Sequence, residues 1–121
     1  MERFVCGTEV ISGEDALSVL GQLGCRRMLV VTPPRLLGRD RLPPVIRAAG
    51  NPQTEVFEDG FPPASMTRAV EGSRRITAFQ PDLVAVLGDG NTMDLGKAMV
   101  CFSRQRCTLA VIPTAPGAGA E

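Results

Sequence analysis

Histidine is absent from this chain of 121 residues. Its absence excludes Ser-His-Asp and Cys-His catalysis, and a zinc or iron site with histidine ligands cannot be assembled from this chain alone. The four cysteines are Cys6, Cys25, Cys101 and Cys107, and their spacing contains no C-x-x-C pair. We therefore interpret them as small apolar residues and not as metal ligands or activated nucleophiles.

Tryptophan and tyrosine are also absent, and 13 basic residues are balanced by 13 acidic ones. Without a block of lysine and arginine, the chain lacks the positive field and the base-stacking side chains of nucleic-acid-binding domains. No apolar run approaches the roughly 20 residues that span a bilayer, and Met1–Val5 has no signal-peptide apolar region. We therefore expect a cytoplasmic protein without nucleic-acid or membrane partners.

Short apolar runs alternate with amphipathic segments along the chain. The predicted strands cover residues 3–6, 27–31, 54–57, 83–87 and 109–112. The predicted helices cover residues 12–23, 37–49, 64–79 and 91–102. In the third helix, the residues expected to face the core are Met66, Ala69, Val70, Ile76 and Phe79. This order predicts a Rossmann-like, doubly wound α/β fold with a mostly parallel sheet, helices on both faces, and a single domain over residues 1–121.

The first glycine segment, Gly88–Lys97, directly follows an apolar strand. Glycine lets the backbone approach an anion, and the first N–H groups of a helix are unpaired and lie at its positive end. Asn91 is the expected N-cap, with Asp94 three residues later. Glycine at position 96 costs roughly 1 kcal/mol inside a helix relative to alanine. We attribute its presence there to close packing of the helix on the strand. Asp89 disfavours a phosphate site, so a plain strand-to-helix turn with a surface lysine is the alternative.

The second glycine segment, Ile112–Glu121, follows the last strand and is expected to reach the same edge of the sheet. Two glycine-containing loops at neighbouring strand ends would enclose a pyrophosphate group. The alternative is a frayed chain end.

Both segments resemble motifs of the iron-dependent (group III) alcohol dehydrogenases. Gly88–Lys97 looks like the GGGSxxDxAK motif of that family, and Ile112–Glu121 looks like its IPTTAGTGSE motif. Phe79–Asp82, just before the motif strand, is a further match. The resemblance covers essentially the whole chain but only the N-terminal, nucleotide-binding half of such an enzyme. Cys101–Gln105 is most similar to short-chain alkanol members such as 1-propanol dehydrogenases.

The resemblance implies NAD or NADP as the cofactor. By position, Gly88, Gly90 and Asn91 match loop residues that contact the pyrophosphate. Asp94 matches an aspartate beside the cofactor, Lys97 the motif lysine, and Thr114 a threonine near the phosphates and the nicotinamide ribose. The predicted cofactor-binding set is Gly88, Asp89, Gly90, Asn91, Asp94, Lys97, Thr114 and Gly117.

Several positions depart from the family pattern. Asp89 replaces a glycine, and alanine replaces hydroxyl-bearing residues at 115, 118 and 120. Thr32-Pro33-Pro34 stands where relatives often carry an acid that reads the adenosine ribose, which leaves NAD and NADP undecided. The family's metal, Fe(II) or another divalent ion, is held by an aspartate and three histidines of a C-terminal helical domain. This chain ends before them, so we expect no catalytic or metal-binding residue in it and no activity from it alone.

We therefore predict the nucleotide-binding half of an enzyme that oxidises a small primary alcohol to an aldehyde. A homodimer that pairs through the first strand is a candidate assembly, as in relatives. One alternative is a degenerate structural or assembly module that no longer binds nucleotide. Another is a sugar-phosphate or other phosphate-binding domain unrelated to dehydrogenases.

Overall fold

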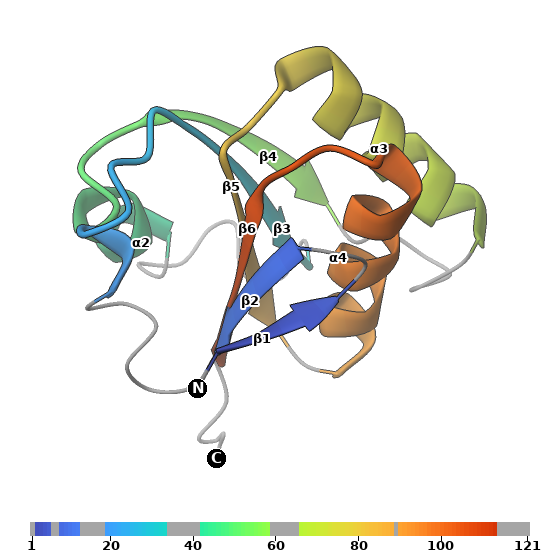
Figure 1. Ribbon diagram of the computed structural model, residues 1–121, viewed down its shortest axis with the longest axis horizontal. Helices are drawn as coiled ribbons and strands as arrows, with labels where there is room; N and C mark the ends of the chain where they lie inside the picture. The colour runs from blue at the N-terminus through green and yellow to red at the C-terminus, as the bar shows by residue number, and fades with distance from the viewer. Residues whose placement is uncertain are drawn as a thin grey trace.

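The computed structural model describes residues 2–5, 8–12, 19–33, 42–58, 66–88 and 90–113. Six strands form one sheet in the order β1-β2-β6-β5-β3-β4 (Figure 1). The strands are β1 Glu2–Val5, β2 Thr8–Ser12, β3 Arg27–Thr32, β4 Gln53–Glu58, β5 Leu83–Gly88 and β6 Thr108–Pro113. The helices are α2 Leu42–Ala48, α3 Met66–Phe79 and α4 Gly90–Ser103. All neighbouring strands are parallel except β1 and β2, which confirms the predicted Rossmann-like α/β fold.

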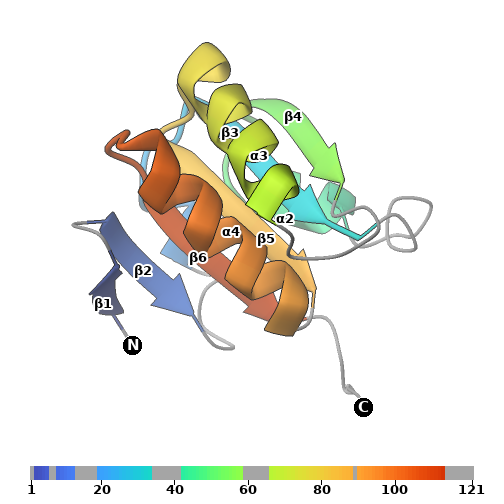
Figure 2. The same ribbon diagram turned by 90° about the vertical axis from the view of Figure 1, so that its right-hand side faces the viewer.

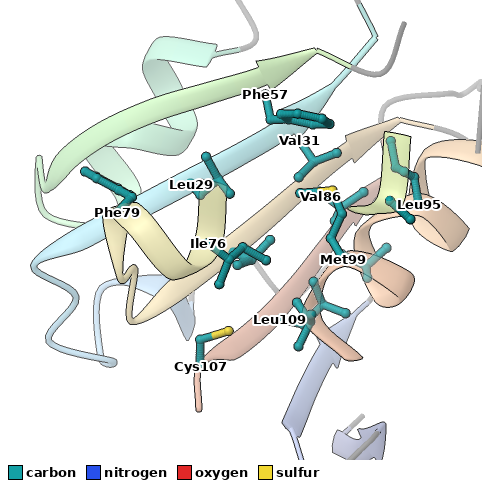
Figure 3. Close-up of a cluster of buried hydrophobic side chains, with 14 residues drawn as sticks. Leu29, Val31, Phe57, Ile76, Phe79, Val86, Leu95, Met99, Cys107 and Leu109 are labelled. Atoms are coloured by element: carbon teal, nitrogen blue, oxygen red, sulfur yellow. The ribbon is translucent and has the colours of Figure 1, made fainter. Parts of the chain in front are cut away.

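The central strands are buried on both faces, as continuous apolar runs predict. Leu29 and Val86 belong to a cluster that also holds Ile76 of α3 and Met99 of α4 (Figure 3). The alternate side chains of the same strands pack with Val45 of α2 in a second cluster. Helices α3 and α4 lie side by side over one face of the sheet, and α2 lies on the other (Figures 1 and 2).

The N-terminal hairpin differs from the prediction. The sequence predicted one strand at residues 3–6 and a helix from residue 12, but β1 pairs antiparallel with β2, and Ser12 ends β2. The β-branched Val10 and Ile11 favour a strand, and β2 pairs with β6 from Val10 onward. Residues 13–18 of the expected helix lie outside the described residues.

The core-facing side of α3 was also predicted incorrectly in part. Met66 and Val70 are 69% and 36% exposed. Ala69, Ile76 and Phe79 are buried as expected, but the other buried residues are Gly72 and Ser73. Small residues line this side because α4 packs closely against it: a Cβ placed on Gly72 would lie 2.4 Å from the Met99 Cγ. A search for large apolar residues cannot find such a contact.

Asp82 lies at the amino-terminal edge of the sheet, opposite the edge where the first glycine segment begins. Its carboxylate accepts hydrogen bonds from the backbone N–H groups of Arg26 (3.0 Å) and Arg27 (3.1 Å). The Arg27 guanidinium donates to the Phe79 carbonyl (2.7 Å) and lies 5.5 Å from the centre of the Phe79 ring. The Phe79–Asp82 match therefore marks a structural junction between α3 and the start of β3 and β5.

Acid should weaken this junction. Partial burial raises the pKa of Asp82, but hydrogen bonds from the Arg26 N–H, the Cys25 thiol and the Arg27 N–H outweigh it, so the pKa lies below its ordinary value of 3.8. A lowered pKa stabilises the fold above the unfolded-state value, and this contribution is lost as the pH falls through the folded-state value. We expect Asp82→Asn to lower the free energy of unfolding by about 1 kcal/mol at neutral pH. In urea titrations the difference from wild type should close below pH 3.8.

The control for this substitution is Asp94→Asn, because Asp94 is exposed on α4. It should leave the dependence of stability on pH close to that of wild type. A deficit of Asp82→Asn that stayed constant from neutral to acid pH would contradict a role for the Asp82 charge.

The cysteines fall into two groups. Burial, followed by the hydrogen bond to Asp82 and the charge of Asp82, raises the pKa of Cys25 to about 12. Burial and the Asp82 charge raise the pKa of Cys107 to about 11, so both thiols stay protonated at neutral pH and are poor nucleophiles. Cys101 is disulfide-bonded, contrary to the interpretation of all four cysteines as simple apolar residues, because sequence spacing does not reveal spatial proximity.

Candidate functional site

The carboxyl ends of β3 and β5 form the topological switch point of the sheet. The two strands are hydrogen-bonded neighbours, with Val31 paired to Val86. The helix after β3, α2, packs on one face, and the helix after β5, α4, packs on the other. In open α/β sheets ligands bind where neighbouring strands lead to helices on opposite faces. We call the ends of β3 and β5, together with the first turn of α4, the switch-point edge.

Gly88, the last residue of β5, lies at this edge. It is buried with a φ of 151°, in a region that side chains rarely adopt. A Cβ at this position would lie 2.8 Å from the Thr92 Oγ1 and 3.2 Å from the Pro33 Cδ. The turn after β5 therefore presses against both α4 and the end of β3, and glycine is required on conformational and steric grounds.

The first turn of α4 is open to solvent. Gly90 and Asn91 are exposed, and no atom lies within 4 Å of the place where a Gly90 Cβ would be. The predicted capping arrangement is wrong, because the helix begins at Gly90 and Asn91 therefore lies inside its first turn. The start of a helix, where the first N–H groups have no intrahelical partner and the dipole is positive, still favours an anion here.

Asp94 and Lys97 follow one and two turns further along α4. Asp94 is exposed and Lys97 is half-buried, and residues spaced by four and seven from Gly90 share one side of a helix. Gly96, also in this helix, confirms the predicted close packing, since a Cβ there would lie 2.4 Å from the Val86 Cγ2.

The second glycine segment starts beside the first. In the sheet register Gly88 is paired with Pro113, so its start reaches the same edge, as predicted. The remaining predicted site residues, Asp89, Thr114 and Gly117, lie outside the described residues, as do the alanines of this segment.

Two threonines at this edge were missed by the sequence analysis. Thr92 is 1% exposed and packs at Gly88. Thr32, the last residue of β3, is also 1% exposed, and its Oγ1 has no hydrogen-bond partner. Residues 32–34 were interpreted only as the place of a missing acid. The sequence signal for Thr32 is a hydroxyl residue at the end of a strand that is otherwise entirely apolar after its first residue.

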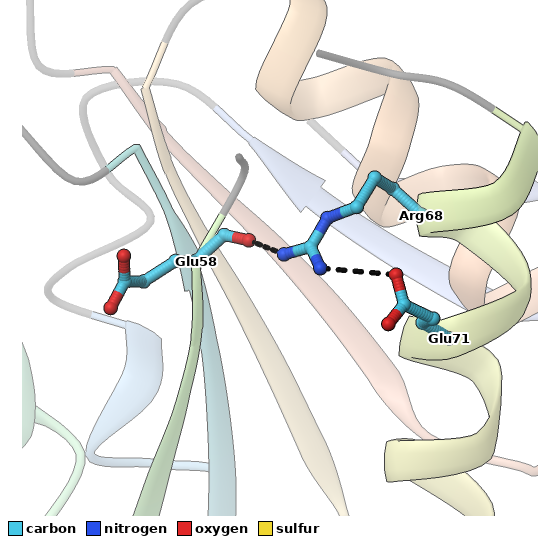
Figure 4. A network of polar contacts seen from close by, with 3 residues as sticks. All are labelled: Glu58, Arg68 and Glu71. Carbon is cyan, nitrogen blue, oxygen red and sulfur yellow. Dashed lines mark hydrogen bonds and ion pairs between the residues drawn. The ribbon is translucent and has the colours of Figure 1, made fainter. Parts of the chain in front are cut away.

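A cavity of about 430 Å³ lies elsewhere, between β4 and α3. On its wall, Arg68 donates to the Glu58 carbonyl and pairs with Glu71 at 3.1 Å (Figure 4). The Arg68 guanidinium also lies 4.3 Å from the centre of the Phe57 ring. Arg75 is paired with Glu55. These charged groups pair with one another and connect α3 to the edge strand β4. We therefore interpret this cavity as a structural contact and not as part of the switch-point edge.

Neither a metal centre nor a membrane span is found in the described part of the chain. No group of three or more histidine, cysteine, aspartate or glutamate side chains is placed there to hold a metal ion. The described helices are also not long and apolar enough to cross a bilayer.

The sheet order and the glycine turn at its switch point define a doubly wound α/β domain of the Rossmann-like class. Residues 7–121 match the family model for iron-containing alcohol dehydrogenases. The chain belongs to this family, which confirms the resemblance seen in the two glycine segments.

Individual relatives agree with this assignment. The 1-propanol dehydrogenase PduQ of Citrobacter freundii is 31% identical over 127 residues, which cover 100% of this chain and 34% of the relative. A 1,3-propanediol oxidoreductase structure matches with a TM-score of 0.71 at 18% identity, covering 97% of this chain and 35% of that one. The sulfoacetaldehyde reductase of Bifidobacterium kashiwanohense, solved with NAD+, matches with a TM-score of 0.69 at 18% identity over 86% of this chain and 33% of that one. These structures support the fold, and the chain spans about a third of the length of its relatives.

Proposed function

We propose that residues 1–121 are the NAD(P)-binding domain of an iron-containing alcohol dehydrogenase that oxidises a small primary alcohol to an aldehyde. The observation that carries the proposal is the glycine turn at the switch-point edge, where a Cβ on Gly88 would meet Pro33, the residue after β3, and where Gly90 faces open space. The likeness to a 1-propanol dehydrogenase supports the alcohol class.

The described residues fit a dinucleotide. In the proposal, the backbone N–H groups of Gly90 and Asn91 hold the pyrophosphate at the start of α4, and the missing side chain of Gly90 leaves room for it. Asp94 and Lys97 line the same side of the helix. A bound nicotinamide ring would supply the hydride-accepting chemistry, while the protein would supply binding and orientation. Pro33 has no carboxylate that could hydrogen-bond the adenosine ribose of NAD or repel the 2′-phosphate of NADP. The domain should therefore accept both NAD and NADP.

The described residues do not fit a catalytic metal. They contain no suitable ligand cluster, and the sequence contains no histidine. The metal and the alcohol site of the proposed enzyme would therefore come from outside the described residues.

Strand β1 lies at an outer edge of the sheet, which supports the proposed homodimer through that strand.

Titration with NADH and NADPH, followed by nicotinamide fluorescence and calorimetry, tests the proposal. We expect saturable binding of both. Gly90→Asp should weaken it by at least about tenfold, because a carboxylate would stand where the pyrophosphate binds. The same substitution should not unfold the helix, since Gly90 faces open space and an acid suits a helix N-terminus.

The matched control is Thr67→Asp, which adds the same charge in the first turn of α3 at an exposed position and should leave binding unchanged. Equal weakening by both variants would indicate a nonspecific charge effect. A folded wild-type chain that bound neither nucleotide at millimolar concentration would overturn the proposal and favour the degenerate module, which the alanines at 115 and 118 support.

A further inference from the structure

Thr32 holds an unpaired hydroxyl in the interior. The described residues contain three buried polar side chains, Thr32, Ser73 and Thr92. The Ser73 hydroxyl donates to the Val70 carbonyl at 2.7 Å, and Thr92 also has a partner. The Thr32 Oγ1 has none. Buried polar groups without a partner are uncommon because they lose their hydrogen bonds to water on folding, so this one requires an explanation.

The position of Thr32 links it to the switch-point edge. It is the last residue of β3, and the next residue, Pro33, lies against the place where a Gly88 Cβ would be. By strand alternation its side chain shares a face with Met28 and Val30, which belong to an otherwise apolar cluster. A buried water needs two or more polar partners, and this apolar face offers a poor site for one.

We propose that Thr32 is a cofactor-binding residue whose hydroxyl donates a hydrogen bond to a ribose or phosphate oxygen of the dinucleotide. This inference rests on the proposed function. A dinucleotide whose pyrophosphate lies at the first turn of α4 passes the neighbouring end of β3, because β3 and β5 are adjacent. Since the Thr32 Oγ1 is covered in the ligand-free protein, binding includes a local displacement of the atoms over it. The free protein thus tolerates an unpaired hydroxyl that the ligand satisfies.

Thr32→Val tests the inference, because valine keeps the shape and removes the hydroxyl. In the ligand-free protein the Tm should rise by a few degrees, since an unsatisfied buried group is lost. The affinity for NADH should fall by roughly 3- to 10-fold, the value of one hydrogen bond. Opposite signs for stability and affinity are not expected of a residue that only packs. Thr32→Ser, which retains the hydroxyl, should keep the wild-type affinity and lower the Tm.

The control is Ser73→Ala, which removes a buried hydroxyl that already has a partner and should change the Tm without changing the affinity. If wild type binds NADH and Thr32→Val binds equally well, the inference is overturned while the proposed function stands. A lower Tm for Thr32→Val would show that the hydroxyl has a partner in the free protein and would also overturn it. If wild type binds no NADH, the proposed function fails and the inference fails with it.

Discussion

Replacing Gly88 by alanine is expected to lower the free energy of unfolding by about 2–6 kcal/mol. Two costs add. A side chain at a φ of 151° strains the backbone by about 1–3 kcal/mol. The new Cβ would also lie within 3 Å of two Thr92 atoms and 3.2 Å from the Pro33 Cδ, and overpacking of this kind costs about 1–3 kcal/mol. Neither neighbour yields easily, because Thr92 is buried and the proline ring is stiff. Urea unfolding followed by circular dichroism measures the loss.

Gly90→Ala is the control for this substitution. Gly90 lies two residues away in a helix, and its Cβ would meet no atom within 4 Å, so alanine should be neutral or stabilise by up to about 1 kcal/mol. Because the Gly88 contacts join α4 to the end of β3, Gly88→Ala should also weaken NADH binding if the proposed site is correct. Equal stability of the two variants would show that the turn does not need glycine.

The strongly patterned elements could be predicted from the sequence. Strand β5 was expected at 83–87 and is observed at Leu83–Gly88. Helix α3 was expected at 64–79; its end at Phe79 is confirmed, and residues 64 and 65 lie outside the described residues. A continuous apolar run and a helical repeat are local signals, because the order of apolar and polar residues within the segment itself indicates which side chains are buried. The start of α4 was similarly accessible, because a glycine turn after a buried strand is also a local signal.

The errors arise where the deciding contact is distant in sequence. Strand β2 was missed because its apolar run is short and the strand is stabilised by pairing with β6, almost a hundred residues later in the chain. The small side of α3 follows from the approach of Met99 to Gly72. The proposed role of Thr32 depends on β3 lying beside β5, although β4 stands between them in the chain. The predicted cofactor-binding set as a whole stays a prediction.

The close packing of α4 on β5 provides the second large effect. A Cβ on Gly96 would lie 2.4 Å from the Val86 Cγ2, and Val86 is fully buried in the central strand. Gly96→Ala is therefore expected to cost about 2 kcal/mol, because the overpacking outweighs the gain of about 1 kcal/mol in helix propensity. Val86→Ala should cost about 2 kcal/mol through the lost methyl groups. The double substitution should cost at least about 1 kcal/mol less than the sum of the two single substitutions. Val86→Ala removes the methyl group that the new Cβ at position 96 would meet, and that Cβ fills part of the cavity that Val86→Ala leaves.

Gly72→Ala tests whether the cost of Gly96→Ala comes from the contact with Val86 or from any larger residue in a packed helix. Its Cβ would also lie 2.4 Å from a neighbour, but the atoms it meets belong to the Met99 side chain. Methionine is unbranched and can change rotamer, whereas the Val86 side chain is branched at Cβ and stiff. Gly72→Ala should therefore cost less than Gly96→Ala in the same urea titration. Strict additivity of Gly96→Ala and Val86→Ala would show that α4 shifts away from the sheet instead of pressing on Val86, and the α4 end of the switch-point edge would then be less rigid than the Gly88 contacts require.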